Sequence, residues 1–226
     1  MTQTPSHPPL SGLYAVTPDE PDTDRLLDSV RWILAGGCRW VQYRNKTADD
    51  LLRQRQAGAL NNLCRTEGAA LIVNDDVRLA REVGAAGVHL GRDDASPEEA
   101  RKMLGDAAII GLSCYRDLGR AERFAQAYGM NEGGRPPNVY LAFGAAYPSL
   151  TKPEAPLAAA GIFRDACRFP LPVCAIGGIA LENAEPLIRM GVAMVAVIHD
   201  IFSRPAAEIT ARVFAYQKLF EESRHA

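Results

Sequence analysis

The feature that most constrains the fold is a regular alternation of short apolar segments with longer amphipathic ones, which continues from residue 11 to the end of the chain. Each apolar segment is a nearly continuous run, as is typical of strands that are buried on both faces of a parallel sheet. We predict that these runs are strands, and they cover residues 12–17, 38–44, 69–74, 86–91, 107–113, 139–144, 172–178 and 193–198.

The segments between the apolar runs are predicted to be helices. Ser96 followed by Pro97 is a favourable helix start, and Thr47 stands in a similar place before the second helix. Glycines such as Gly84 follow several of these segments, as they often do at helix C-termini. The predicted helices lie near residues 23–36, 48–67, 76–83, 96–104, 116–128, 154–168, 182–190 and 205–222.

Strand–helix units repeated along the chain predict an α/β fold with a parallel eight-stranded (βα)8 TIM barrel. The repeat takes about 26 residues per unit, which is at the lean end for this barrel. The competing fold is an open doubly wound sheet, but no GxGxxG motif follows the first strand. No linker divides the chain, so we expect one domain over residues 11–226 after a flexible N-terminal tail of residues 1–10, with a flexible loop at 129–138.

Composition excludes several classes of protein. The 226 residues carry 25 Lys+Arg against 27 Asp+Glu, and this balance argues against a nucleic-acid-binding protein. No apolar run approaches the length of a membrane span, and the first residues lack the pattern of a secretion signal. The five cysteines form no CxxC pair, so we expect reduced thiols in a cytoplasmic protein. The sequence leaves open whether the chain forms a homo-oligomer.

Candidate binding groups follow the second predicted strand. Because strand side chains alternate, Gln42, Arg44 and Lys46 share one face. If Val41 and Tyr43 pack outward against helices, that face points into the barrel mouth, where functional groups of such barrels gather. An arginine and a lysine together suit a diphosphate, although a solvated strand end with ordinary ion pairs is an equal alternative.

Carboxylates follow the next two strands. Asn74 and Asp75 end the third strand, and Asp94 follows the fourth. Hard oxygen ligands that leave room for water and phosphate suit Mg²⁺. Taken singly, each aspartate is more typical of a helix cap, and Asp75 is a candidate cap for the helix that begins near residue 77. The metal interpretation gains weight because the two aspartates would lie opposite the two cations.

Hydroxyl groups and glycines follow the remaining strands. Ser113 has two interpretations, as a donor to a phosphate or as a cap of the following helix, and Cys114 has no neighbouring histidine that would make it a nucleophile. Two hydroxyls and a cation follow the sixth strand, at Ser149, Thr151 and Lys152. Such groups suit a phosphate monoester. Paired glycines after the seventh strand let backbone N–H groups approach an anion closely. His199, after the eighth strand, faces the same corner, where such barrels often hold phosphate.

Several ordered motifs, which together span about residues 12–202, make the chain resemble the thiamine-phosphate synthase family. The motifs are GLYAVTP, VQYRNK, LIVNDD, GVHLGRDD, GLSCY, YPSLTKP and AIGGI. The resemblance implies a barrel enzyme that joins 4-amino-2-methyl-5-(diphosphooxymethyl)pyrimidine to 4-methyl-5-(2-phosphooxyethyl)thiazole. The products would be thiamine phosphate and pyrophosphate, formed with Mg²⁺ by departure of pyrophosphate and attack of the thiazole nitrogen.

The resemblance also assigns residues to each ligand. Arg44, Lys46 and Lys152 would be catalytic, and Asp75 and Asp94 would bind the metal. The pyrimidine diphosphate would contact Gln42, Arg44, Lys46, Asn74, Ser113 and Lys152, and the thiazole phosphate would contact Ser149, Thr151, Gly178, Ile198 and His199.

The chain departs from the family pattern at three places near the site. Cys114-Tyr115 stands where many members have Thr-His, Ser149 where threonine is common, and His199 where serine is usual. Three rival functions are a thiazole tautomerase or regulatory relative on the same barrel, a non-catalytic phosphate-ligand-binding barrel, and a phosphosugar isomerase or epimerase. The intact groups for diphosphate and metal favour the synthase over the first rival. The second rival predicts ligand binding without turnover, and the third would need a carboxylate or histidine base facing a bound sugar, which the sequence does not clearly place.

Overall fold

Eight parallel strands close into a barrel in the computed structural model, which describes residues 7–128, 138–149 and 154–224. Each strand pairs with its neighbours in sequence order, and β1 pairs with β8 to close the sheet. This confirms the predicted barrel and all the apolar runs as strands. The strands are β1 (Gly12–Val16), β2 (Trp40–Tyr43), β3 (Ala70–Asn74), β4 (Gly87–Leu90), β5 (Ile109–Tyr115), β6 (Val139–Gly144), β7 (Val173–Ile176) and β8 (Met194–Val197).

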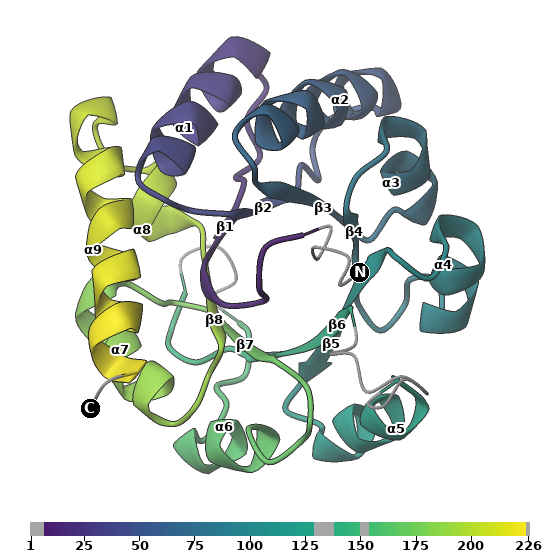
Figure 1. The fold of residues 1–226 in the computed structure, drawn as a ribbon, viewed down its shortest axis with the longest axis vertical. Helices are drawn as coiled ribbons and strands as arrows, with labels where there is room; N and C mark the ends of the chain where they lie inside the picture. The colour runs from purple at the N-terminus through teal and green to yellow at the C-terminus, as the bar shows by residue number, and fades with distance from the viewer. Residues whose placement is uncertain (1–6, 129–137, 150–153, 225–226) are drawn as a thin grey trace, which may run out of the picture.

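Helices form a ring around the outside of the barrel (Figure 1). They connect successive strands, so every βα loop lies at the same end of the barrel. The helices are α1 (Thr23–Ala35), α2 (Asp50–Thr66), α3 (Val77–Val83), α4 (Pro97–Leu104), α5 (Leu118–Tyr128), α6 (Ala160–Ala166), α7 (Leu181–Arg189), α8 (His199–Phe202) and α9 (Ala206–Arg224).

The helix starts agree with the prediction at α4 and differ at α2. Ser96 caps α4, where its side chain and that of Glu99 exchange hydrogen bonds with each other's backbone N–H. Thr47 is not the cap of α2, because Asp49 accepts the hydrogen bond from the Leu52 N–H at 2.8 Å. The Thr47 hydroxyl instead donates to the Asn45 side chain, within the turn that precedes the helix.

Two further differences lie in the second half of the chain. Helix α6 begins only at Ala160, because the preceding stretch is tied to the end of β6 by hydrogen bonds from Ala145 N to Pro156 O and from Ala158 N to Ala145 O. The short helix α8 after β8 was not predicted. The predicted loop at 129–138 lies outside the described residues, apart from Asn138.

The core has two parts, one on each face of the sheet. The larger part lies between the strands and the helices. The smaller part fills the barrel interior with side chains from alternate strand positions, among them Tyr14, Trp40 and Tyr140. Since the interior is packed by side chains, the barrel is a solid core with functional groups at its rim rather than a channel.

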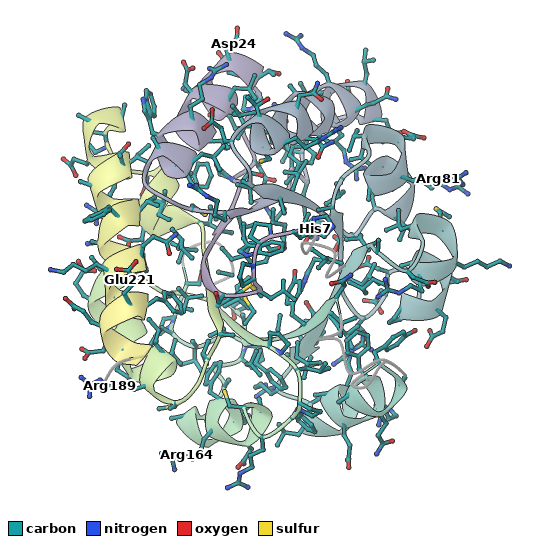
Figure 2. The ribbon with its side chains drawn as sticks, in the orientation of Figure 1. His7, Asp24, Arg81, Arg164, Arg189 and Glu221 are labelled. Atoms are coloured by element: carbon teal, nitrogen blue, oxygen red, sulfur yellow. The ribbon has the colours of Figure 1, made fainter. Side chains whose placement is uncertain are left out.

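The first described residues lie against the barrel at the end opposite the βα loops. The Trp40 indole N–H donates to the Pro9 carbonyl at 2.8 Å, and Leu10 packs on the interior core. Figure 2 shows His7 within the outline of the barrel, toward β3 and β4, while Arg81 and Arg164 point outward from the helix ring. These residues belong to the segment that we predicted as a tail, and the domain boundary stays a prediction. None of the described helices has the length and apolar character needed to cross a membrane.

Candidate functional site

The end of β2 has the predicted alternation of side chains. Val41 and Tyr43 pack into the outer core, which confirms the condition on which the inward orientation of the intervening residue depended. Gln42 is buried, and its amide nitrogen donates to the Tyr14 hydroxyl inside the barrel at 2.9 Å. Gln42 therefore forms part of the barrel interior, and the residues that follow it continue toward the rim.

Arg44 is held by residues from the loop after β1. Its guanidinium forms an ion pair with Asp19 at 3.0 Å, and its backbone N–H donates to the Thr17 hydroxyl at 2.8 Å. Asp19 also accepts from the backbone N–H of Lys46 at 2.6 Å. The sequence reasoning missed Asp19, although its place three residues after β1 puts it on the same rim as the other strand ends.

Lys46 and the two aspartates lie together at the mouth. The Lys46 Nζ atom is 3.3 Å from Asp75 Oδ2, and the Asp94 carboxyl neighbours that of Asp75. A cavity of about 570 Å³ brings Arg44, Lys46, Asn74 and Asp75 into one space. Arg44, Lys46 and the two aspartates are therefore neighbours, as the strand order implied.

The structure excludes the alternative role of Asp75 as a helix cap. The cap of α3 is Asp76, whose side chain accepts from the Leu79 N–H at 2.9 Å. Asp75 has the left-handed backbone conformation with φ of 64°, and its N–H donates to the His89 carbonyl of β4 at 2.8 Å. This conformation, which aspartate tolerates better than most residues, leaves the Asp75 carboxylate for the mouth.

Asp94 has an environment that suits a shared cation. Partial burial raises the pKa of Asp94, the neighbouring Asp75 carboxyl raises this pKa further, and the Gly91 N–H and Lys46 act in the opposite direction. Asp94 Oδ2 accepts from the Gly91 N–H at 2.6 Å, which fixes one carboxylate oxygen. Two adjacent carboxylates repel each other when both are ionised, and a divalent cation would relieve that repulsion.

The donor set fits Mg²⁺ better than a cage made only of protein groups. Within the described segments, no group of three or more His, Cys, Asp and Glu side chains is placed to hold a metal ion. Mg²⁺ commonly binds one or two carboxylates and takes its other ligands from water and substrate phosphates. Asp75 and Asp94 supply that number of carboxylates.

The Ser113 side chain, on β5, is hydrogen-bonded to a residue of β4 and not to the helix that follows. Its hydroxyl is 2.8 Å from His89 Nε2, so its interpretation as a helix cap is wrong. Helix α5 is preceded instead by Asp117, which accepts from the Arg120 N–H. Sequence reasoning missed His89, because a single histidine in an apolar run is typical of a packed core residue.

The Cys114-Tyr115 pair contributes structure at the rim. Cys114 is buried, and burial raises the pKa of its thiol to about 12, so the thiol stays protonated. Tyr115 has φ of 56° and lies beneath the Arg92 guanidinium, which is 5.1 Å from the ring centroid. Its hydroxyl accepts from the Arg92 backbone N–H at 3.3 Å. Tyr115 therefore holds the loop that carries Asp94.

The glycines after β7 are required by a close approach of two loops. Gly178 has φ of 62°, and a Cβ atom at this position would lie 2.2 Å from the Pro148 carbonyl oxygen. The Asn183 side chain donates to the Gly178 carbonyl at 3.1 Å and accepts from the Ala180 N–H. This loop is thus fixed beside the segment that leads into Ser149, which is half-buried.

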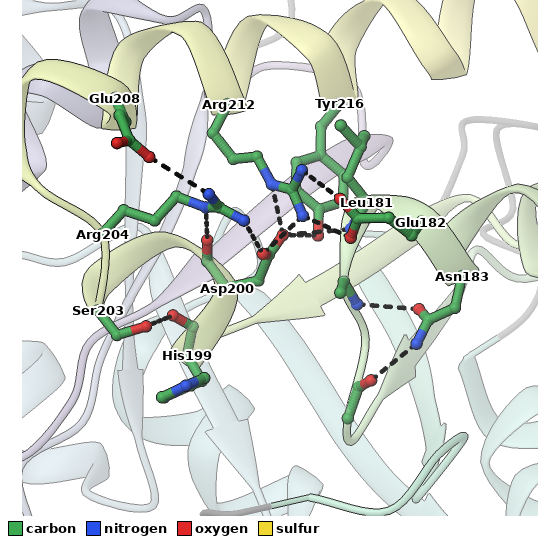
Figure 3. Close-up of polar contacts among 12 residues, drawn as sticks. Leu181, Glu182, Asn183, His199, Asp200, Ser203, Arg204, Glu208, Arg212 and Tyr216 are labelled. Atoms are coloured by element: carbon green, nitrogen blue, oxygen red, sulfur yellow. Dashed lines mark hydrogen bonds and ion pairs between the residues drawn. The ribbon is translucent and has the colours of Figure 1, made fainter.

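The corner after β8 is anchored by Asp200, as Figure 3 shows. The Asp200 carboxylate accepts from Arg204 at 2.8 Å, from Arg212 at 2.7 and 2.8 Å, from the Tyr216 hydroxyl at 2.7 Å and from the Leu181 N–H at 3.2 Å. Burial alone would raise the pKa of Asp200, but these hydrogen bonds outweigh burial and lower it. The cluster joins α7, α8 and α9, and it supports the turn at Ile198 and the exposed His199.

Two of the predicted residues, Thr151 and Lys152, lie outside the described residues. The remaining predicted residues form two groups. One group contains the charged and polar residues at the ends of β2 to β5, and the other contains the loops after β6 to β8. All of them lie at the carboxyl ends of strands, the end at which barrels of this kind place their functional groups.

The fold and this mouth define a (βα)8 barrel with the groups needed to bind phosphorylated small molecules. Comparison with known proteins gives a specific family. Residues 13–201 match the family model described as thiamine monophosphate synthase. The thiamine-phosphate synthase of Methylobacillus flagellatus is 47% identical over 215 residues, which cover 95% of this chain and 98% of that protein. The thiamine-phosphate synthase of Thiobacillus denitrificans is 50% identical over 210 residues, covering 90% and 95%.

A solved structure agrees with this assignment. The thiamine phosphate pyrophosphorylase from Pyrococcus furiosus superposes with a TM-score of 0.77 at 28% identity, covering 95% of this chain and 97% of that chain. The chain belongs to the thiamine-phosphate synthase family and is an enzyme. This confirms the resemblance that the sequence motifs indicated.

Proposed function

We propose that the protein condenses the aminopyrimidine diphosphate with the thiazole phosphate to give thiamine phosphate and pyrophosphate. The observation that carries this proposal is the grouping of Arg44, Lys46, Asp75 and Asp94 at the barrel mouth. The identity of the two substrates is inferred from the family, because the relatives are named thiamine-phosphate synthases.

The reaction exchanges one bond at the pyrimidinylmethyl carbon. Its bond to the diphosphate oxygen breaks, and the electron pair leaves with pyrophosphate. The thiazole nitrogen then forms a bond to the resulting carbocation, whose charge the aminopyrimidine ring delocalises. No protein nucleophile or strong general base is needed, which agrees with the high pKa and complete burial of the Cys114 thiol.

The protein stabilises the leaving group through cations. Arg44 and Lys46 would bind the departing diphosphate, together with Lys152. Mg²⁺ held by Asp75 and Asp94 would neutralise part of the charge that grows on pyrophosphate. Gln42, Asn74 and Ser113 would orient the pyrimidine diphosphate, since their polar groups lie at or below the same rim.

The second substrate would bind at the corner formed after β6 to β8. Ser149 and Thr151, with the backbone at Gly178, Ile198 and His199, would hold the thiazole phosphate. Holding the thiazole by its phosphate places its nitrogen near the carbocation, and such positioning accounts for a large part of the rate of bimolecular enzyme reactions.

The proposal extends to location and partners. We expect a cytoplasmic enzyme that acts on small phosphorylated substrates without nucleic acid, and homo-oligomerisation stays open. The near-neutral charge, with 25 Lys+Arg against 27 Asp+Glu, supports the absence of a nucleic-acid partner.

The direct test is to incubate the purified protein with both substrates and Mg²⁺ and to measure thiamine phosphate and pyrophosphate. We expect equal amounts of the two products, and none when either substrate is omitted. Ligand binding without turnover would support the non-catalytic rival, and isomerisation of a thiazole substrate alone would support the tautomerase. Either result would overturn the proposal.

A further inference from the structure

A chain of polar side chains crosses the barrel interior and ends at the mouth. It begins with Gln42 Nε2, which is 2.9 Å from the Tyr14 hydroxyl, and Tyr14 is 2.9 Å from the Tyr140 hydroxyl. The Tyr140 hydroxyl is 2.9 Å from His89 Nδ1, and His89 Nε2 is 2.8 Å from Ser113 Oγ. These five residues come from five strands, so this series of hydrogen-bonded side chains connects most of the barrel.

This series of hydrogen-bonded side chains is held in place by tight packing. Tyr14 and Tyr140 are 2% and 1% exposed, and the rings of His89 and Tyr140 stack with centroids 5.6 Å apart. Gly111 provides the room for this stack, because a Cβ atom there would lie 2.2 Å from the Tyr140 ring and 2.6 Å from His89 Nδ1. The hydrogen-bond partners of His89 are therefore determined by packing.

The donor and acceptor in each hydrogen bond of this series follow from its first donor, the Gln42 amide nitrogen. The Gln42 amide nitrogen can only donate, so the Tyr14 oxygen accepts from it. Among the described residues, Tyr140 is the only other hydrogen-bond partner of the buried Tyr14 hydroxyl, so Tyr14 donates its hydrogen to Tyr140. The Tyr140 hydrogen then goes to His89 Nδ1. Because Nδ1 accepts from Tyr140, the His89 ring carries its hydrogen on Nε2, which lies 2.8 Å from the Ser113 oxygen. The Ser113 oxygen accepts that hydrogen, and its own hydrogen is directed away from His89.

We propose that Tyr140 and His89 are positioning residues that fix the Ser113 hydroxyl as a hydrogen-bond donor toward the diphosphate. This inference rests on the proposed function, in which Ser113 contacts the pyrimidine diphosphate. A hydroxyl that donates to an anionic oxygen stabilises it, whereas one whose lone pairs face the anion repels it. The His89 carbonyl also accepts from the Asp75 N–H, so the same residue is bonded to a proposed metal ligand.

The first test measures the tautomer of His89 without any substrate. The full-length protein, with its histidines labelled with ¹⁵N, is studied by NMR at pH 7.5, and His89 is identified by the signals lost in His89→Gln. We expect the Nε2–H tautomer in the wild type and in Tyr14→Phe, which leaves the Tyr140–His89 bond intact. In Tyr140→Phe, Nδ1 loses its donor, and the Nδ1–H tautomer should become populated. An Nδ1–H ring in the wild type, or no change in Tyr140→Phe, would overturn the proposal.

The second test measures whether the effect passes through Ser113. We expect Tyr140→Phe to lower kcat/KM about 10-fold in the wild type but less than about 2-fold in a Ser113→Ala background. Thermal unfolding verifies that each variant is folded. Equal losses in the two backgrounds would mean that Tyr140 acts independently of Ser113 and would overturn the proposal.

The outcomes separate this inference from the function on which it rests. Wild-type kcat/KM in Ser113→Ala would overturn the substrate contact and the inference together. An absence of thiamine phosphate in the wild-type assay would overturn the proposed function, and a wrong tautomer would overturn the inference alone. His89→Gln, whose amide nitrogen can still donate to Ser113, should retain more activity than His89→Leu.

Discussion

Lys46 Nζ lies 3.3 Å from Asp75 Oδ2, so a cation from the end of β2 and a carboxylate from the end of β3 share one edge of the barrel mouth. Their side chains are 52% and 34% exposed, which leaves both accessible to a ligand. A diphosphate bound to Lys46 and a metal ion bound to Asp75 would therefore be neighbours. A metal–diphosphate complex suits this pair, because its anionic diphosphate would bind Lys46 and its metal ion would bind Asp75.

Removing either of two cations should impair catalysis. Arg44→Ala or Lys152→Ala is expected to lower kcat/KM by about 100-fold or more, because each removes a charge-assisted contact to the departing pyrophosphate. Steady-state kinetics with both substrates measures this effect. Arg164→Ala and Lys218→Ala, at exposed positions on the outer helices, serve as controls and should retain wild-type kinetics. Wild-type rates in both mouth variants would contradict the assignment.

Gly178 should be intolerant of a side chain. Gly178→Ala places a Cβ atom 2.2 Å from the Pro148 carbonyl oxygen at φ of 62°, so the two loops must move apart. We expect KM for the thiazole phosphate to rise about 10-fold or more, with a smaller effect on KM for the pyrimidine. Gly161→Ala in α6 is the matched control, since a Cβ atom there meets nothing within 4 Å. Equal kinetics in the two variants would show that the loop contact is not needed.

Asp200 should stabilise the fold in a pH-dependent way. Asp200→Asn removes the carboxylate from Arg212, whose side chain is only 11% exposed, and should cost about 3 kcal/mol of unfolding free energy at pH 7. The pKa of Asp200 is lower in the folded state than the usual value of 3.8. The contribution of its charge is therefore fully present above pH 3.8 and is lost as the pH falls through the folded-state pKa.

Denaturant unfolding from pH 3 to pH 8 measures this difference. The gap between wild type and Asp200→Asn should be constant above about pH 5 and should narrow in acid. Asp165→Asn, which removes an exposed ion pair with Arg168, is the matched control and should change the unfolding free energy by less than about 0.5 kcal/mol. A gap that does not depend on pH would indicate that the carboxylate charge is unimportant.

Much of the fold could be predicted from the sequence, because buried parallel strands leave continuous apolar runs. The alternation at Val41, Gln42 and Tyr43 also predicted which side chains enter the barrel, since its period is fixed by strand geometry. Helix α8 could not be predicted, because four residues are too few to show a helical period. The start of α6 depends on hydrogen bonds to the end of β6, and such contacts leave no local pattern.

The candidate site was predicted in part. Motifs indicated the groups after β2 to β4, and strand order placed them side by side. Asp19 and His89 were missed, because their roles depend on partners far away in the sequence. The candidate cap of α3, Asp75, was wrong by one residue, because Asp76 accepts the capping hydrogen bond while Asp75 has the left-handed conformation.

The central claim is that cations and a metal ion at this mouth hold the diphosphate as it leaves. It is tested most directly by measuring pyrophosphate release as a function of Mg²⁺ concentration in the wild type and in Asp94→Asn. The amide oxygen of the substituted side chain can still accept from the Gly91 N–H, so the substitution removes mainly the charge. We predict that Asp94→Asn needs about 10-fold or more Mg²⁺ for half-maximal release. An unchanged Mg²⁺ dependence would contradict the account.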